Sequence, residues 1–470
     1  MKTIIVIGAG FCGTAVAVQL LRRAGAEPTR VLLLNRSGLM ARGVAYGTRT
    51  ESHVLNVPAG RMSALPHDPG SFLRYAQGRD ARVTGASFVP RRWFGDYLES
   101  LLAKAAHQAA ADVRFRAMVG DVIGISIVEG QGQVELASGE CIVADRVVLA
   151  LGNFAPADPP LADASFFTSP RYVRDPWRPD ALWGVAADQP VLLVGTGLTM
   201  LDVLLDLKSR GHHAPIYALS RRGLLPQAHR TLEEPPKYRG QLAEHLAAQA
   251  NVRKALALLR RELRETAAQG IDWRDVIGGL RKATPAIWAR WPEAEKRRFM
   301  RHARPHWEIH RHRCAPAQNA ALCEELATGR LRVLAGRLTA CEDDIDGVTA
   351  QWQTRGSQQL KSLRVGSVIN CTGPASDTRR LREPLLLSLA ASGLLRRDAL
   401  GLGLDTDDRY ALLDRHGKAS PVLHYIGPFL KAKWWEATAV PELAEHSARL
   451  AGGLMESLGD TAASPVLQKA

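Results

Sequence analysis

Ile4-Ile5-Val6-Ile7-Gly8-Ala9-Gly10-Phe11-Cys12-Gly13 stands near the start of the chain and indicates its architecture. An apolar run that ends in Gly-x-Gly-x-x-Gly is typical of a buried strand that turns directly into a helix. The glycines permit a tight turn, and they let backbone N–H groups approach a pyrophosphate at the positive end of the helix dipole. Gly8, Gly10, Phe11, Cys12 and Gly13 are therefore predicted to bind a dinucleotide.

A second turn of this kind occurs at Val191-Leu192-Leu193-Val194-Gly195-Thr196-Gly197-Leu198-Thr199-Met200. Gly195 and Gly197 repeat the first two glycines. Met200 replaces the third, so the following helix must pack a larger side chain against its sheet. Two such turns predict two bound dinucleotides and an α/β protein with two Rossmann-like, three-layer domains.

The strand that follows each turn ends in polar residues that suit the adenosine end of a dinucleotide. Asn35 and Arg36 follow the apolar strand 31–34, and Asn35 replaces the usual acidic residue but can still bond a ribose hydroxyl. Strand 215–219 ends in Ser220-Arg221-Arg222. Guanidinium groups bind phosphate oxygens in pairs, so these three residues favour NADPH over NADH. The alternative is two exposed arginines at a strand end.

The two turns are followed by similar groups of elements. A helix at 92–111 precedes short strands at 113–115, 122–128 and 134–137, and the apolar run 146–151 ends in Gly152. The later group begins at 331–334, continues at 347–353 and 362–364, and ends in a strand before Gly373. Gly152 and Gly373 are predicted to face the cofactors. This repetition supports duplication of one dinucleotide-binding plan.

The pattern predicts a discontinuous first domain of residues 1–155 and 335–470. The second domain, 185–334, contains a helix-rich insertion at 237–312 that carries four tryptophans. A strand at 422–426 and a helix at 441–454 complete the first domain, and residues 459–470 are expected to form a frayed tail.

Composition is that of a globular protein with two or three domains: 470 residues, 46% hydrophobic and 23% charged. No run approaches the ~18 apolar residues of a membrane span, and no secretion signal precedes the first strand. The six cysteines have no CxxC or metal-ligand spacing, which predicts free thiols in a reducing cytoplasm. We therefore expect a cytoplasmic protein without a membrane contact.

The formal net charge of +14 indicates a basic surface. No nucleic-acid-binding pattern accompanies it, so the alternatives are a solvated surface or attraction of anionic cofactors and substrate. His302, His306 and His310 share a four-residue spacing, but Pro305 interrupts their helix and no carboxylate or thiolate completes a zinc set. We expect no metal. No hydrolase or kinase motif is present.

Three further motifs carry a family resemblance. These are Val44-Ala45-Tyr46-Gly47-Thr48 with 55–63, the stretch 304–313 (RPHWEIHRHR), and 435–443 (WEATAVPEL). They resemble a bacterial family of FAD/NAD(P)-binding proteins related to the two-dinucleotide-domain monooxygenases, which include ornithine N-hydroxylases and Baeyer–Villiger enzymes. The resemblance covers nearly the whole chain. One activity assigned in this family is FAD-dependent urate hydroxylation.

The resemblance implies FAD, a nicotinamide reductant, O2 and a small polar or anionic substrate, with urate, hydroxylated to 5-hydroxyisourate, as the candidate. Asn56-Val57-Pro58 is a rigid stretch suited to line a flat flavin ring. Backbone N–H groups at Gly427, Thr438 and Val440 suit its pyrimidine end. Conventional loops and a helix cap are the alternative. The residues expected to act on the substrate are Arg61, His306, His310, Arg311, Trp434 and Asn56.

Two other functions remain open at this point. The protein could be an NAD(P)H-dependent flavin reductase or oxidase that inserts no oxygen. It could also be a redox sensor that binds FAD without turnover. Product and peroxide measurements separate the first from a monooxygenase, and absence of turnover identifies the second.

Overall fold

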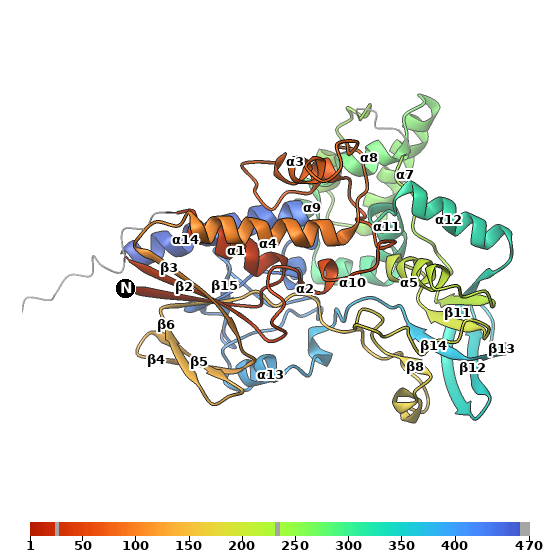
Figure 1. Cartoon of the computed structure of the whole chain (residues 1–470). Coiled ribbons are helices and arrows are strands. Elements are labelled where there is room, and N and C mark those ends of the chain that lie inside the picture. The colour runs from red at the N-terminus through yellow and green to blue at the C-terminus, as the bar shows by residue number, and fades with distance from the viewer. Residues whose placement is uncertain (24–27, 231–235, 461–470) are drawn as a thin grey trace, which may run out of the picture.

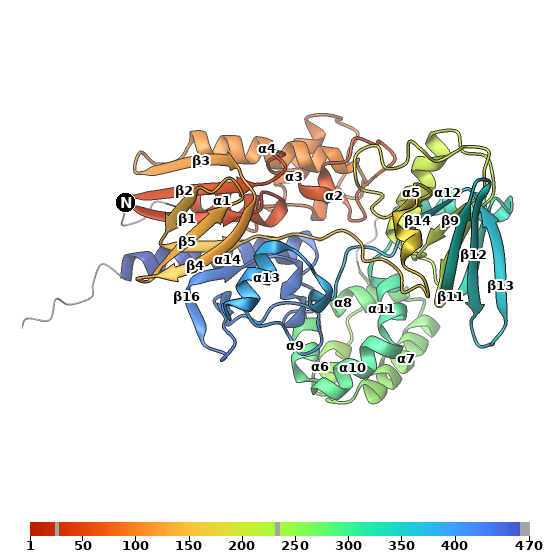
Figure 2. The same cartoon turned by 90° about the horizontal axis from the view of Figure 1, so that it is seen from below.

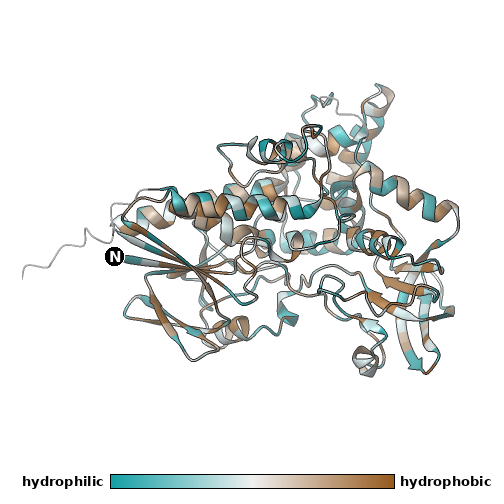
Figure 3. Ribbon diagram, viewed as in Figure 1, coloured by the Kyte–Doolittle hydropathy of each residue, from teal (hydrophilic) through white to brown (hydrophobic). Residues whose placement is uncertain are grey.

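The computed structural model describes residues 1–23, 28–230 and 236–460. Two α/β domains lie side by side, and a group of helices packs against both of them (Figures 1 and 2). The sequence predicted a frayed tail at 459–470, but the last helix continues through Gly459 to Asp460. Residues 461–470 of the predicted tail lie outside the described residues. Hydrophobic residues are concentrated along the central strands of the sheets (Figure 3).

The first domain contains a six-stranded sheet in the order β15-β16-β7-β1-β2-β3. All neighbouring strands are parallel except β15 and β16. Helices α1, α4 and α14 cover one face, and the separate three-stranded sheet β4-β5-β6 packs on the other (Figure 2). The predicted three-layer α/β arrangement is therefore confirmed. The strands are β1 (Lys2–Ile7), β2 (Thr29–Asn35), β3 (Val113–Val119), β4 (Val122–Val128), β5 (Gln131–Leu136), β6 (Cys141–Ala144), β7 (Arg146–Leu149), β15 (Ala411–Leu413) and β16 (Ala419–Tyr425).

The helices of this domain include the one predicted after the first glycine turn and the one predicted near the C-terminus. They are α1 (Phe11–Leu21), α2 (Gly43–Tyr46), α3 (Ser71–Gln77), α4 (Arg91–His107), α13 (Pro384–Ala391) and α14 (Val440–Asp460), with short 3₁₀ turns at Ala59–Arg61, Thr378–Arg380 and Pro428–Ala432. The α1 and α14 helices pack along each other on one face of the sheet. The N-terminal and C-terminal parts of the chain thus share one hydrophobic core.

One predicted strand belongs to a different sheet from the one expected. The strand at 113–115 was grouped with the following meander, but β3 pairs in parallel with β2 and extends the main sheet. The third meander strand is β6, which the sequence did not predict. β6 has only four residues and is followed almost at once by the apolar run of β7, so the sequence does not separate it as a strand of its own.

The second domain contains a seven-stranded sheet in the order β13-β12-β11-β10-β9-β14-β8. Helices α5 and α12 pack beside it (Figure 1). Its elements are β8 (Tyr172–Val173), β9 (Val191–Val194), α5 (Leu198–Ser209), β10 (Ile216–Ser220), α12 (Pro316–Ala327), β11 (Leu331–Asp344), β12 (Gly347–Thr354), β13 (Leu360–Val365) and β14 (Ser367–Asn370), with a 3₁₀ turn at Ser165–Thr168.

This sheet corrects the predicted domain boundary. The sequence placed residues from 335 onward in the first domain, but β11 to β14 all belong to the second sheet. β11 pairs in parallel with β10 through Ala335 and then continues as a long antiparallel partner of β12. The chain returns to the first domain only after Asn370, and β8 shows that the second domain begins before the predicted residue 185.

The predicted helical insertion lies between β10 and α12, and α11 ends at Arg311. Its core contains buried aromatic side chains, and Trp435 from the first domain joins Trp288 and Phe299 there. The insertion therefore packs on the C-terminal segment of the first domain. Its helices are α6 (Leu242–Ala247), α7 (Val252–Ala268), α8 (Trp273–Gly279), α9 (Thr284–Arg290), α10 (Glu293–His302) and α11 (Arg304–Arg311).

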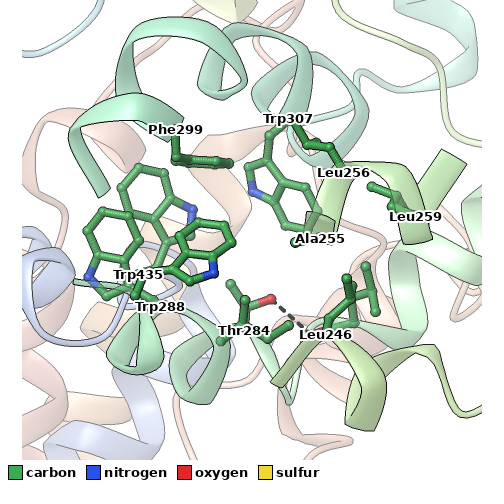
Figure 4. Close-up of a pocket in the computed structure, with 12 residues that line it drawn as sticks. Leu246, Ala255, Leu256, Leu259, Thr284, Trp288, Phe299, Trp307 and Trp435 are labelled. Atoms are coloured by element: carbon green, nitrogen blue, oxygen red, sulfur yellow. Dashed lines mark hydrogen bonds between the residues drawn. The ribbon is translucent and has the colours of Figure 1, made fainter. Parts of the chain in front are cut away.

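A small cavity of about 60 Å³ lies inside this insertion (Figure 4). Aliphatic side chains of α6 and α7 line one side, and Trp288, Phe299, Trp307 and Trp435 line the other. The Thr284 hydroxyl on its wall donates to the Leu280 carbonyl, 2.9 Å away. The cavity offers apolar surface and belongs to the packing of the insertion.

Candidate functional site

The first glycine turn is built as the sequence predicts. The Gly8 N–H donates to the Leu34 carbonyl at 2.8 Å, and Gly8 has a φ of +103°. A Cβ at Gly8 would lie 2.5 Å from the Ala150 carbonyl oxygen, and one at Gly13 would lie 1.8 Å from the Gly8 oxygen. Larger residues cannot replace these glycines without moving α1 away from the sheet. Gly10 approaches the backbone of Gly43, to which a Cβ would come within 3.6 Å.

The second turn repeats this construction. The Gly195 N–H donates to the Leu219 carbonyl at 2.8 Å, and a Cβ at Gly195 would lie 2.4 Å from the Cys371 oxygen. A Cβ at Gly197 would meet no described atom within 4 Å, so the turn leaves open space in front of α5. Met200 is fully buried and packs in the core of the second domain, so the larger side chain at the third glycine position fits between the helix and the sheet, as predicted.

Both helix N-termini have the properties of an anion site. In the described part of the chain, neither α1 nor α5 has a side-chain cap or an acidic residue in its first turn. The first amide groups of a helix have no partner within the helix, and the helix dipole favours negative charge at this end. The two turns therefore fit the pyrophosphates of two dinucleotides.

The residues after β2 also fit a dinucleotide. The Asn35 amide nitrogen donates to Ser37 Oγ at 3.0 Å and to the Leu39 carbonyl at 2.8 Å. These bonds orient the side chain, and Oδ1 is the atom that could accept a ribose hydroxyl. Arg36 forms an exposed ion pair with Glu383, 3.0 Å away.

A hollow of about 400 Å³ lies beyond the end of β10. Arg221, Arg337 and Arg355 line it together with Gln353 and Ser357. All three arginines are exposed, and none of them forms an ion pair within the described ranges. Such a group of free guanidinium groups is suited to a phosphate.

The other two members of the predicted Ser-Arg-Arg set have structural contacts. Ser220 Oγ accepts from the Thr196 hydroxyl at 2.8 Å and from the Gly223 N–H at 3.0 Å, which shapes the turn after β10. Arg222 donates to the Arg301 carbonyl at 3.0 Å and lies 3.4 Å from His306 Nε2. Arg222 therefore joins the second domain to the insertion, and Arg221 faces the hollow.

The predicted glycines at the carboxyl ends of the strands lie at corresponding places in the two sheets. A Cβ at Gly427 would come within 2.8 Å of the Leu151 oxygen, so Gly427 lies beside the Gly152 segment. A Cβ at Gly152 or at Gly373 would meet no described atom within 4 Å. The Thr438 N–H donates to the Glu436 carbonyl at 2.6 Å, and α14 begins at Val440.

The first domain, the second domain and the insertion meet at Asn56. His229 Nε2 donates to the Asn56 carbonyl at 3.0 Å, and its ring lies 5.0 Å from that of Phe88. Burial, followed by the charge of Arg313, lowers the pKa of His229 to about 4. The imidazole is therefore neutral near pH 7. Its contact places the predicted flavin-lining stretch 56–58 beside the second domain.

Several arginines surround this junction. Arg274 donates to the Ala228 carbonyl at 2.8 Å and lies 4.5 Å from the Trp273 ring centroid. Arg313 approaches the same ring at 5.8 Å, and its Nε is buried without a hydrogen-bond partner among the described residues. Burial, and then Arg274, Arg311 and Arg61, lower the pKa of Arg313 to about 10. The charges of Arg274, Arg311 and Arg61 therefore all act unfavourably on that of Arg313.

The residues predicted to act on the substrate do not all reach this junction. Arg61 and His310 border it, since the His310 ring packs edge-on against Trp273 at 4.9 Å. Arg311 is neutralised by Glu436 at 2.5 Å. His306 is exposed next to Arg222, and Trp434 packs against Tyr410 and His446 in the first domain. Their roles in catalysis remain predictions.

Sequence reasoning did not identify His229, Trp273, Arg274, Arg337 or Arg355 as site residues, and it did not single out Arg313 within the stretch 304–313. Arg313 is the last residue of the arginine- and histidine-rich stretch 304–313, and spacing alone does not show which side chains of that stretch are paired. Arg337 and Arg355 carry no motif. Only the pairing of β11 with β10 and β12 brings them to Arg221.

Across the described residues, no three histidine, cysteine, aspartate or glutamate side chains come together in a way that could hold a metal ion. Nor does that part of the chain contain a helix with the length and apolar character needed to cross a membrane.

Comparison with known proteins supports the dinucleotide fold. Residues 5–154 match the model of a family described as FAD-NAD(P)-binding. No curated protein matches the sequence. The structure is similar to the L-lysine 6-monooxygenase of Pseudomonas syringae, with a TM-score of 0.63 and 18% identity over 97% of this chain and 100% of that chain.

Two further solved structures share the arrangement. The ornithine N-hydroxylase of Kutzneria sp. 744, a structure with reduced FAD, NADP+ and L-ornithine, has a TM-score of 0.63 and 15% identity over 96% of this chain and 98% of that chain. The thioredoxin reductase of Lactococcus lactis has a TM-score of 0.52 and 10% identity over 98% and 100%, respectively. The fold of this chain is therefore that of two-domain flavin monooxygenases and thioredoxin reductases.

Proposed function

We propose that this protein is an FAD-dependent monooxygenase that uses NADPH and O2 and hydroxylates a small polar substrate. The observation that carries the proposal is the pair of uncapped glycine turns, one on each parallel sheet. The match of residues 5–154 supports FAD at the first turn. The fold of N-hydroxylating monooxygenases supports the reaction class.

The chain's own residues would bind and orient the reactants. The turn Gly8–Gly13 would hold the FAD pyrophosphate, with Asn35 on its ribose. Gly195 and Gly197 would hold NADPH, with Arg221, Arg337 and Arg355 on the 2′-phosphate. Bound FAD would supply the redox chemistry, accepting hydride from NADPH and activating O2. The junction around Asn56 and His229 would place the substrate and exclude water.

Urate is the first substrate to test, because the family resemblance implies it. It is a planar anion near neutral pH, which suits a junction with an excess of guanidinium groups. Amines and amino acids form the second class, because the similar solved structures are named for ornithine and lysine. An amino acid also carries a carboxylate, so the charge of the junction is compatible with it.

The first experiment is the visible spectrum of the purified protein. Bands near ~370 and ~450 nm would demonstrate bound flavin. NADPH and NADH oxidation should then be measured with urate, ornithine, lysine and cadaverine, together with O2 uptake, peroxide and product. A monooxygenase releases hydroxylated product in proportion to the O2 consumed. Peroxide equal to the O2 consumed would identify an oxidase, and absence of turnover with bound flavin would identify a redox sensor.

Arg221 provides the test of the nicotinamide site. Arg221→Ala should raise KM for NADPH by about ten- to a hundredfold, because a charge-assisted phosphate contact contributes roughly 1.5–3 kcal/mol. KM for NADH should change little. Arg114→Ala is the matched control, since Arg114 is exposed on β3 in the other domain. Equal effects of Arg221→Ala on both nucleotides would contradict the assignment of this residue.

A further inference from the structure

Arg313 carries a charge that the protein leaves unbalanced. Its Nε is buried without a hydrogen-bond partner, and no described carboxylate pairs with its guanidinium group. The nearest aromatic face, that of Trp273, is 5.8 Å away and is already covered by Arg274 at 4.5 Å. Arg313 is partly exposed, and a partly buried charge without a counter-ion is unfavourable unless another molecule supplies one.

The carboxylates around the junction are already paired with other arginines. Asp272 and Asp275 accept from Arg230 at 3.2 and 2.8 Å, and Asp272 also accepts from Arg274. Glu436 is 2.5 Å from Arg311. Arg61 follows the Asn56–Pro58 stretch that His229 contacts, its charge is one of those that lower the pKa of Arg313, and it forms no ion pair with any described residue. The charges that remain free at this place are therefore both positive.

The backbone holds these groups beside the predicted flavin-lining stretch. The His229 N–H donates to the Cys314 carbonyl at 2.9 Å, and the Cys314 N–H donates to the Gln227 carbonyl at 2.9 Å. His229 in turn reaches the Asn56 carbonyl at 3.0 Å. These backbone hydrogen bonds hold Cys314, and with it Arg313, beside His229 and the contact between the two domains.

We propose that Arg313 and Arg61 form the subsite that binds an anionic group of the substrate, a carboxylate or a delocalised ring oxyanion. The proposal rests on the monooxygenase function proposed above and adds the residues that would select the substrate. Two guanidinium groups from different domains would hold the anion between them. A substrate with only positive charge would be repelled, whereas an amino acid or a planar anion would be attracted.

A dinucleotide phosphate is the other possible source of the anion. The pyrophosphates already have two uncapped helices, α1 and α5, and the 2′-phosphate has the hollow at Arg221. Arg313 lies in neither place, because it follows α11 and packs near Trp273. The structure therefore favours the substrate as the source.

The test measures anion binding to the flavin-loaded protein. Acetate, benzoate, inorganic phosphate and urate are titrated at constant ionic strength with chloride as the balancing ion, and the flavin absorbance and thermal midpoint are recorded. The variants are Arg313→Gln and Arg61→Gln, with Arg114→Gln as a control that removes the same charge from an exposed, unpaired position on β3. Because Arg61 is exposed, its variant is expected to fold even if Arg313→Gln does not.

Wild type and Arg114→Gln should bind one or more of these anions saturably and with equal Kd. Arg313→Gln and Arg61→Gln should bind at least about tenfold more weakly, with unchanged flavin content and unchanged KM for NADPH. Equal Kd in the Arg61→Gln variant, or absence of saturable binding to wild type, would overturn the proposal. A loss of flavin or a raised KM for NADPH with unchanged anion binding would assign the arginines to a dinucleotide and would also overturn it.

Failure of the proposed function and failure of the anion subsite would give different results. If wild-type protein binds no flavin, the monooxygenase proposal fails, yet anion binding can still be followed by the thermal midpoint. If flavin binds and NADPH reduces it while the variants bind anions like wild type, only the anion subsite fails.

Discussion

The ion pair between Arg91 and Asp202 is expected to hold the two nucleotide-binding domains together. Arg91 begins α4 in the first domain, and Asp202 lies in α5 of the second. Their side chains are 2.7 Å apart and only 13% and 3% exposed. Arg91 also donates to the Val54 carbonyl at 3.0 Å and lies over the Trp177 ring at 5.2 Å. Because α5 carries the second glycine turn, this pair orients that turn relative to the first domain.

Substitution of either partner should reduce the free energy of unfolding, but by different amounts. Arg91→Met leaves the Asp202 carboxylate buried with only a weak contact to Gln318 at 3.4 Å, so we expect a loss of about 3–5 kcal/mol in the free energy of unfolding. Asp202→Asn leaves the guanidinium in contact with Val54 and Trp177, and we expect a smaller loss, roughly 1.5–3 kcal/mol. The double variant should lose less than the sum, because no buried charge remains.

Urea unfolding of the flavin-loaded protein, followed by flavin fluorescence and by circular dichroism, measures these losses. The stopped-flow rate of flavin reduction by NADPH should fall in both single variants if the pair positions α5. The mutant cycle provides the decisive result. Additive losses, within about 0.5 kcal/mol, would refute the reasoning, since residues that act as a pair show a coupling energy. Arg92→Met is a control, because Arg92 is adjacent on α4 but pairs with Glu51 at a more exposed site.

Four further results are expected. Gly13→Ala should abolish flavin binding, because its Cβ would lie 1.8 Å from the Gly8 oxygen; Gly197→Ala should instead raise KM for NADPH without changing flavin content, since its Cβ enters open space. Leu280→Ala should enlarge the aromatic cavity and reduce the free energy of unfolding by about 2–5 kcal/mol, measured by urea titration. Burial lowers the pKa of His424 from 6.5 to about 4, so as the pH falls the unfolded chain takes up a proton at this histidine before the folded chain does. The free energy of unfolding should therefore decrease between pH 6.5 and pH 4, and His424→Gln should make this decrease smaller. Cys141 and Cys323 should react rapidly with iodoacetamide, whereas burial raises the pKa of Cys12 to about 12 and should keep it unreactive until the protein unfolds.

The elements that local constraints determine could be predicted from the sequence. Gly8 and Gly195 are needed because their conformations, with φ of +103° and +118°, are strained for other residues and because a neighbouring carbonyl leaves no space. Such requirements act within a few residues and appear as motifs. The domain boundary could not be found in this way. The sequence of β11 resembles the start of a second meander, and only its pairing with both β10 and β12 shows that it continues the second sheet.

The candidate site depends on contacts between distant segments, which spacing does not reveal. The stretch 304–313 is rich in arginine and histidine, but Arg311 is neutralised by the distant Glu436, whereas no described carboxylate pairs with Arg313. His229 lies in an irregular loop, and its contact with Asn56 spans 173 positions. A sequence shows where charged residues are dense. It does not show which of the charges remain unpaired, and that property determines where an anion can bind.

The insertion has a second role that follows from its contacts. By sequence it belongs to the second domain, yet Trp288 donates to the Ala432 carbonyl at 2.8 Å, Arg281 pairs with Glu442, and Arg311 pairs with Glu436 in the first domain. The Arg91–Asp202 pair joins the domains at a separate place. Two connections restrain rotation of one domain against the other more than one connection does. We therefore expect the two glycine turns to keep a nearly fixed distance and orientation relative to each other.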